Sequence, residues 1–300
     1  MGRLLFLLLI GISAVSTASI FIKLCDAPSL IIAAYRMIFA SLLLTPFVAF
    51  QKRRQDMGTM RLRGCLLSGL FLGLHFAFWI GSLKYTSVAS SVVLVATNPI
   101  FVGIGGWLFL KERLNLNLIL GILFTVLGSG FISLGDTAIS REALLGDGLA
   151  LLGAVSCSGY LLMGRRIRRD QDLLSYIFPV YSMAALLLVF LSLLFQKSFG
   201  GYSSSTYLFM FLIALIPQLI GHTTFNWALK YLPASMVAIT ILGEPIGAII
   251  LAYFILDERL TLWKAIGGVL IFAGIVIALR RAVKEKGSTE AIEERWSPTG

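Results

Sequence analysis

Residues 234–256 read ASMVAITILGEPIGAIILAYFIL, an apolar run long enough to cross a bilayer as a helix, with one acidic residue, Glu244. Burying an unpaired carboxylate in hydrocarbon is costly, so Glu244 has to face protein or water rather than lipid. Pro245 removes a helix donor and leaves a carbonyl about one turn earlier unpaired, which needs the same shelter. The stretch predicts a polar cavity lined by Glu244. The alternative is a structural carboxylate neutralised by a single partner.

The composition is that of a helical membrane protein. Of the 300 residues, 58% are hydrophobic and 13% are charged, whereas a soluble domain carries about 25% charged residues. The mean hydropathy is +0.90, and apolar runs of about 20 residues are typical of membrane-spanning helices rather than of a barrel. The sequence predicts an all-α integral membrane protein with ten transmembrane helices. The predicted spans are residues 4–24, 29–50, 64–83, 87–110, 116–134, 144–163, 173–195, 206–229, 233–256 and 262–279.

Several functional classes find no support in the sequence. The net charge of +10 does not indicate a nucleic-acid partner, because basic residues of helical membrane proteins gather in cytoplasmic loops. The three cysteines, Cys25, Cys65 and Cys157, predict neither a disulfide framework nor a metal site, and we expect no cofactor. GxSxG, HExxH and Walker motifs are absent from the sequence, so we expect neither an enzyme nor an ATP-driven pump.

The N-terminus has two interpretations. Arg3, the apolar stretch 4–10 and the small residues 14–18 resemble a secretory signal peptide. We expect an uncleaved first span instead, because an internal repeat gives this segment a counterpart.

That repeat emerges when the sequence is shifted by 146 positions onto itself. Chance apolar matches are common in membrane segments, whereas prolines and charged residues in one register are not. The coinciding residues are Pro99 with Pro245, Lys84-Tyr85 with Lys230-Tyr231, and Glu112-Arg113-Leu114 with Glu258-Arg259-Leu260. The sequence therefore predicts two five-helix units, residues 1–140 and 141–281, followed by a disordered cytoplasmic tail, 282–300.

The second unit is predicted to enter the membrane upside down, because five is an odd number of spans. Basic residues change loops accordingly, which the positive-inside rule requires of an inverted repeat. They follow the second span in one half (Lys52, Arg53, Arg54, Arg61, Arg63) and the first span in the other (Arg165, Arg166, Arg168, Arg169). The pattern predicts a multi-pass protein of the inner (plasma) membrane with both termini in the cytoplasm.

Polar side chains form stripes on several otherwise apolar spans, at helical spacings. Such stripes are expected to face one another inside the bundle, where they either line a substrate path or hold helices together by hydrogen bonds. The residues for which we expect substrate binding are His75, Trp79, Asn98, His222, Asn226, Trp227 and Glu244.

Asn98-Pro99 and Glu244-Pro245 occupy equivalent places near the middle of the membrane. Two proline-interrupted helices in matching positions point to the central site of a transporter, although prolines are also generally more frequent in membrane helices. Arg36 lies within the second span, and its counterpart, Ser182, is neutral. Arg36 has four open interpretations: it pairs with a carboxylate, caps carbonyls, binds a substrate's carboxylate or snorkels to the interface.

These features resemble the drug/metabolite transporter superfamily, and specifically its ten-helix EamA-type members. The resemblance covers residues 4–280 and rests on the two repeats, on Ala33-Ala-Tyr-Arg36, and on Asn98-Pro99 and Gly243-Glu244-Pro245, each followed by Glu-Arg-Leu and a glycine-rich span. It implies a central cavity formed by spans 1–4 and 6–9, alternating access, and export of amino acids, metabolites or drugs. Asn98 stands where some relatives have Glu.

The sequence as a whole predicts a secondary transporter in the lipid bilayer that exports amino acids or similar small metabolites. The alternatives are a multidrug exporter and a non-transporting receptor or assembly protein on the same scaffold. The sequence leaves open the choice between a monomer and a homodimer.

We predict that single cysteines at positions 54 and 166 react with a membrane-impermeant thiol reagent from the cytoplasmic side, and a cysteine at 197 from the outside. Labelling of intact cells against permeabilised cells measures this. Reaction of positions 54 and 166 from opposite sides would contradict the inverted repeat.

Overall fold

The computed structural model describes residues 2–50, 59–111, 116–134, 141–257, 261–263, 265–274 and 276–277. Within these ranges the chain is helical and contains no strand. The expected tail, 282–300, lies outside them. The helices are α1 Gly2–Ser16, α2 Ala18–Lys23, α3 Ser29–Ala49, α4 Thr59–Ser82, α5 Val88–Val95, α6 Asn98–Leu110, α7 Leu116–Leu134, α8 Arg141–Arg168, α9 Leu173–Leu194, α10 Ser204–Ile213, the π-helix η1 Ala214–His222, α11 Thr223–Ala228, α12 Ala234–Ile241 and α13 Gly243–Ile255.

In the described part of the chain, eight helical segments are long and apolar enough to cross a membrane. They correspond to the predicted spans 1–4 and 6–9. The predicted fifth and tenth spans fall on α7 and on residues after 261, where shorter apolar helices, Ile119–Gly128 and Ala265–Gly274, are described. The all-helical membrane architecture is thus confirmed, and the number of ten spans stays a prediction.

Two of the spans are each interrupted near the middle. The first break separates α5 from α6 and the second separates α12 from α13. A shift of 146 positions carries the bounds of α5 onto those of α12. The same shift carries Lys111 onto Asp257, the residues after α6 and α13, which have left-handed φ angles of 54° and 53°. The spans that carry Pro99 and Pro245 therefore match closely in local geometry, with the bounds of α6 and α13 offset by one residue under the same shift.

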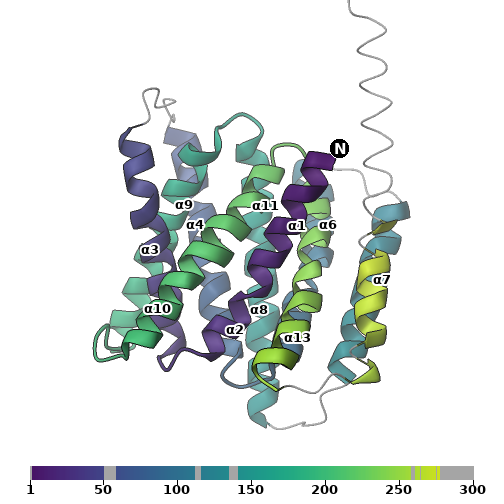
Figure 1. The fold of residues 1–300 in the computed structure, drawn as a ribbon. Coiled ribbons are helices and arrows are strands. Elements are labelled where there is room, and N and C mark those ends of the chain that lie inside the picture. The colour runs from purple at the N-terminus through teal and green to yellow at the C-terminus, as the bar shows by residue number, and fades with distance from the viewer. Residues whose placement is uncertain are drawn as a thin grey trace, which may run out of the picture.

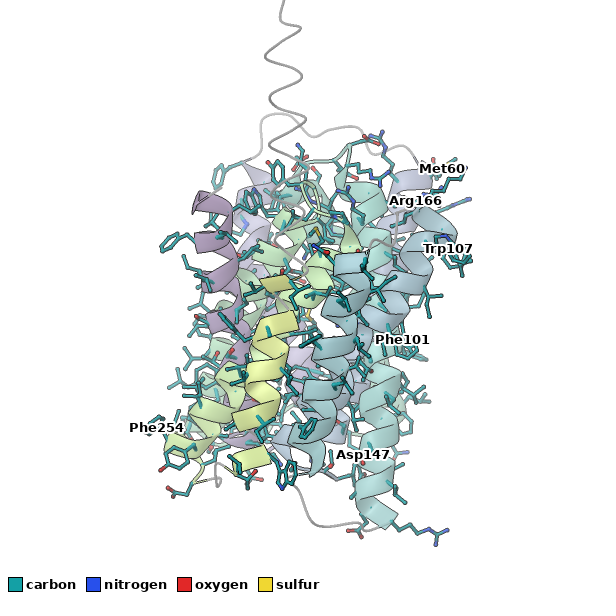
Figure 2. All side chains as sticks on the ribbon, turned by 90° about the vertical axis from the view of Figure 1, so that its right-hand side faces the viewer. Met60, Phe101, Trp107, Asp147, Arg166 and Phe254 are labelled. Atoms are coloured by element: carbon teal, nitrogen blue, oxygen red, sulfur yellow. The ribbon has the colours of Figure 1, made fainter. Side chains whose placement is uncertain are left out.

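Equivalent helices run in opposite directions through the bundle. In Figure 2, Met60 at the start of α4 and Arg166 near the end of α8 lie at the top, whereas Asp147 near the start of α8 and Phe254 near the end of α13 lie at the bottom. α1 descends from the N-terminus at the top, while its counterpart α8 ascends (Figure 1). The start of α4 and the end of α8 are consequently at the same end of the bundle.

Helices of the two sequence halves are interleaved. α4 packs against α8 and α9, α3 against α9, and α1 against η1 and α13. The approach of α4 to α9 is close: a Cβ built on Gly69 would lie 2.6 Å from the carbonyl oxygen of Val180, and one on Gly73 would lie 2.9 Å from Leu187. This GxxxG pair is a helix contact inside the bundle. α7 and residues 265–277 form a pair at one side (Figure 1).

The eighth span contains a nine-residue π-helix, η1, between α10 and α11. Pro217 lies within it, and a proline inside a helix removes the donor that an α-helical turn needs. Hydrogen bonding from i to i+5 is rare and is found mostly at functional sites. η1 carries both Gln218 and His222, so the distortion falls where this span faces the centre of the bundle.

Candidate functional site

A cavity lies in the bundle between the two helix breaks, with walls from spans 1–4, 6, 8 and 9. Its volume is about 30 Å³, far below the roughly 300–1,000 Å³ of ligand pockets. It has room for a water-sized guest, so a metabolite can enter only if helices part. The predicted residues that line it are Arg36, His75, Trp79, Asn98, His222, Glu244 and Pro245.

Arg36 is completely buried in α3, and its guanidinium is held from two directions. Nε donates a hydrogen bond of 2.8 Å to Oε1 of Gln218 on η1, and Cζ lies 3.9 Å from the ring centroid of Phe76 on α4. Nη1 and Nη2 are buried without a hydrogen-bond partner among the described residues. The contacts fix the orientation of the guanidinium and leave its two terminal nitrogens for another group.

Glu244 is half-buried at the start of α13 and lines the same cavity. In the described residues its carboxylate makes no hydrogen bond and no ion pair with Arg36. Its backbone carbonyl accepts a hydrogen bond of 3.3 Å from the hydroxyl of Ser16 on α1. Its sequence counterpart, Asn98, likewise has its carbonyl bonded, at 3.1 Å, to the hydroxyl of Ser158 on α8. The same hydroxyls donate at shorter distances within their own helices, Ser16 to Ile12 at 2.8 Å and Ser158 to Ala154 at 2.7 Å, so each break shares a serine proton with the first helix of the other half.

His75, Trp79 and His222 form an aromatic wall. The rings of His75 and Trp79 are stacked with centroids 5.8 Å apart, and the centroid of His222 lies 6.4 Å from that of His75. Nδ1 of His75 is 3.0 Å from the carbonyl oxygen of Gly153. Because a carbonyl only accepts, this nitrogen carries the proton. The indole nitrogen of Trp79 is buried without a hydrogen-bond partner in the described part of the chain.

The other predicted residues lie outside the cavity lining. Asn226 is fully buried; its side chain accepts from Tyr160 at 2.8 Å and donates to Tyr181 at 3.2 Å, so it reaches the cavity only through Tyr160. Trp227 is half-buried against Tyr231, with ring centroids 4.9 Å apart. Pro99 is buried beside Asn98 in α6 without lining the cavity.

Sequence reasoning missed three residues of the site: Phe76, Gln218 and Tyr160. Phe76 and Tyr160 are ordinary members of apolar runs, and no spacing distinguishes them from lipid-facing aromatic residues. Gln218 lies on a recognised polar stripe, but its pairing with Arg36 joins positions 182 residues apart. Because the η1 distortion also changes the helical register, spacing alone could not identify this contact.

Two basic side chains each donate a hydrogen bond to the carbonyl that follows the end of another helix. Nζ of Lys23, at the end of α2, donates to the carbonyl of Leu83 at 2.7 Å, just after α4. Nη1 of Arg165, in the last turn of α8, donates to the carbonyl of Leu229 at 2.7 Å, just after α11. Leu83 and Leu229 are 146 positions apart, and the C-terminal end of a helix favours a cation. We call these contacts the two end caps.

A second hollow, apolar and larger, lies on the other side of α1. It has a volume of about 640 Å³ and is lined by α1, α13 and residues 272 and 276. Ser16 lines this groove, and it packs so closely on α13 that a Cβ on Gly247 would meet its hydroxyl.

The fold and the enclosed polar cavity define a polytopic helical membrane protein of the transporter class. The model of the EamA-like transporter family matches residues 1–134 and 144–280, and the chain belongs to that family.

Individual relatives agree with this assignment. An uncharacterized transporter of Archaeoglobus fulgidus is 26% identical over 266 residues, which are 88% of this chain and 92% of the relative. The uncharacterized transporter YxxF of Bacillus subtilis is 25% identical over 218 residues, 72% of this chain and 69% of its own. A protein of known crystal structure, 18% identical, superposes with a TM-score of 0.74 over 91% of this chain and 98% of its own, and shares the fold.

We predict that Trp79→Ala lowers the apparent substrate affinity by about threefold to tenfold, as expected for an aromatic contact of about 0.5–1.5 kcal/mol. Trp227→Ala is the matched control, because Trp227 packs on Tyr231 outside the cavity. Counterflow in proteoliposomes measures the apparent KM. Equal losses in the two variants would show that the tryptophans act through packing alone.

Proposed function

We propose that the chain is a secondary transporter that exports amino acids or similar small metabolites from the cytoplasm by alternating access. The observation that carries the proposal is the polar cavity enclosed between the breaks of two membrane-spanning helices. A discontinuous pair of helices is the usual setting of a transporter's central site. A purely structural bundle would have no use for buried charged groups around a hollow.

We further propose that the two halves are an inverted repeat. The protein lies in the plasma membrane, and both termini are in the cytoplasm. The support for the inverted repeat is the opposite direction of α1 and α8, the matching bounds of α5 and α12, and the reciprocal serine bonds at the breaks. Inversion gives a single chain two similar gates that face opposite sides of the membrane.

The end caps are the contacts that we assign to these gates. α2 and α4 flank the cavity toward one end through Ala18 and Trp79, and α8 and α11 flank it toward the other through Leu161 and Phe225. The Lys23 cap joins the first of these pairs and the Arg165 cap joins the second. Both caps are formed together in this structure, so it corresponds to an occluded state. Outward opening would break one cap and inward opening the other.

Multidrug export is the second candidate, favoured by the apolar groove of about 640 Å³ beside α1. Such a groove suits an apolar compound that reaches the site from the bilayer. Export of amino acids against export of apolar dyes, each measured in proteoliposomes, separates the two candidates. A receptor without transport activity would move neither class of compound.

We predict that breaking one end cap opens the cavity to one side only. Cys157 lines the cavity and is 4% exposed, which makes it a native reporter once Cys25 and Cys65 are replaced by Ser. A charged hydrogen bond is worth about 1.5 kcal/mol or more, so its loss should speed labelling about tenfold. We expect an impermeant thiol reagent to reach Cys157 faster from outside in Lys23→Met, and faster from the cytoplasm in Arg165→Met.

The matched controls are Lys197→Met and Arg166→Met, which remove the exposed charge of a residue just after α9 and that of the neighbour of Arg165. Acceleration from the same side in both cap variants would contradict two opposed gates.

We also predict that Glu244→Gln folds but loses the pH dependence of transport. Glutamine retains hydrogen bonding and cannot titrate, and the other titratable or charged side chains of the cavity are Arg36, His75, His222, Cys157 and Tyr160. The measurement is counterflow as a function of pH. Wild-type pH dependence in this variant would leave Glu244 a structural role at the break.

A further inference from the structure

Two side chains of opposite charge line one cavity without forming an ion pair with each other in the described part of the chain. Arg36 is 0% exposed, and Glu244 is half-buried at the second helix break. A buried charge normally survives only with a partner, because removing it from water is costly. The arrangement leaves the cavity with one guanidinium and one carboxyl group, neither of which is held by the other in a salt bridge.

The donors of the cavity gather around Arg36. Its Nη1 and Nη2 have no hydrogen-bond partner among the described residues, and neither has Nε1 of Trp79. The guanidinium carbon lies 5.9 Å from the Trp79 ring, so these three donors belong to one region of the wall. A carboxylate matches the two terminal nitrogens of a guanidinium in a bidentate pair.

The acceptors gather at the two helix breaks. Oδ1 of Asn98 is buried and has no donor within the described residues, and the half-buried carboxyl group of Glu244 lines the same cavity. The two residues occupy equivalent positions of the two halves, one at each helix break. An ammonium group offers three donors and one positive charge, which fits an amide oxygen together with a carboxylate.

We propose that the cavity binds the zwitterionic head of a free α-amino acid, with its carboxylate on Arg36 and its ammonium group at Asn98 and Glu244. The proposal rests on the export function above and specifies the substrate class of that same site. A guest of zero net charge leaves the cavity electrically balanced, which neither a simple anion nor a simple cation would do. His75, Trp79 and His222 then form the apolar wall for the side chain.

Gln218 is the positioning residue of this site. Its Oε1 accepts from Nε of Arg36 while Phe76 covers one face of the guanidinium. These two contacts occupy one edge and one face, so the edge that carries Nη1 and Nη2 remains for the ligand. Gln218 lies on η1, so the π-helical distortion helps to position the guanidinium of Arg36.

The test is equilibrium binding to the purified full chain in nanodiscs with four matched probes. They are L-leucine, its methyl ester, 3-methylbutylamine and 4-methylpentanoate, and the same set is built on L-phenylalanine. The ester and the amine lack the carboxylate, and the acid lacks the ammonium group. We expect the free amino acid of one set to bind at least tenfold more tightly than each of its three analogues.

The variants assign the two ends of the ligand. Arg36→Gln should weaken binding of the amino acid and of the acid at least tenfold, and change binding of the amine less than threefold. Glu244→Gln should weaken binding of the amino acid and of the amine at least tenfold, and change binding of the acid less than threefold. Arg36→Lys should recover part of the loss, since it restores the charge without the bidentate geometry. Arg63→Gln, which removes an exposed arginine of α4, is the matched control and should change nothing.

Two results distinguish failure of this assignment from failure of the proposed function. Equal affinity of the wild-type chain for amino acid and ester overturns the carboxylate assignment, while transport of either compound would leave export intact. Absence of both binding and counterflow for every probe overturns the amino-acid exporter together with the assignment. The wild-type comparison needs no substitution, so it decides the matter even if Arg36→Gln does not fold.

Discussion

The burial of one guanidinium inside a membrane-spanning bundle is the constraint on which the centre of this protein depends. Arg36 cannot reach water along its own helix, so α4 and η1 must supply a ring face and an amide oxygen to it. Through the contact with Gln218, a distorted span from the other half of the chain packs beside Arg36. The interleaving of the halves and the location of the cavity both follow from meeting the needs of this charge.

A second constraint is the backbone at the helix breaks. Carbonyl groups freed near Asn98 and Glu244 cannot face lipid, because hydrocarbon offers no donors. The hydroxyls of Ser158 and Ser16 contact the carbonyls of Asn98 and Glu244, each from the first helix of the opposite half, while their shorter bonds stay within their own helices. The two halves are therefore in contact at both helix breaks. α1 and α8 line the cavity and also bond the backbone of the opposite half.

The sequence predicted much of this architecture, because prolines and polar residues inside long apolar spans are conspicuous in a membrane protein. Eight of the predicted spans coincide with helices, and Pro99 and Pro245 mark both breaks. Six predicted polar or aromatic residues line the cavity. The sequence could not separate Trp79 from Trp227, since both adjoin polar stripes and only packing against Tyr231 removes the second from the centre. It also could not pair Arg36 with Gln218, because no local spacing relates two different helices.

The symmetry of the gates and the asymmetry of the centre have different consequences. The end caps at Leu83 and Leu229 use the same kind of bond at 2.7 Å, so opening either side breaks equivalent contacts. In the proposed mechanism the two gated states differ little in free energy, so a ligand with a modest preference shifts their populations. The counterpart of Arg36 is Ser182, which carries no charge. Under that proposal, two similar gates share the cationic group of Arg36, and one site faces each side of the membrane in turn.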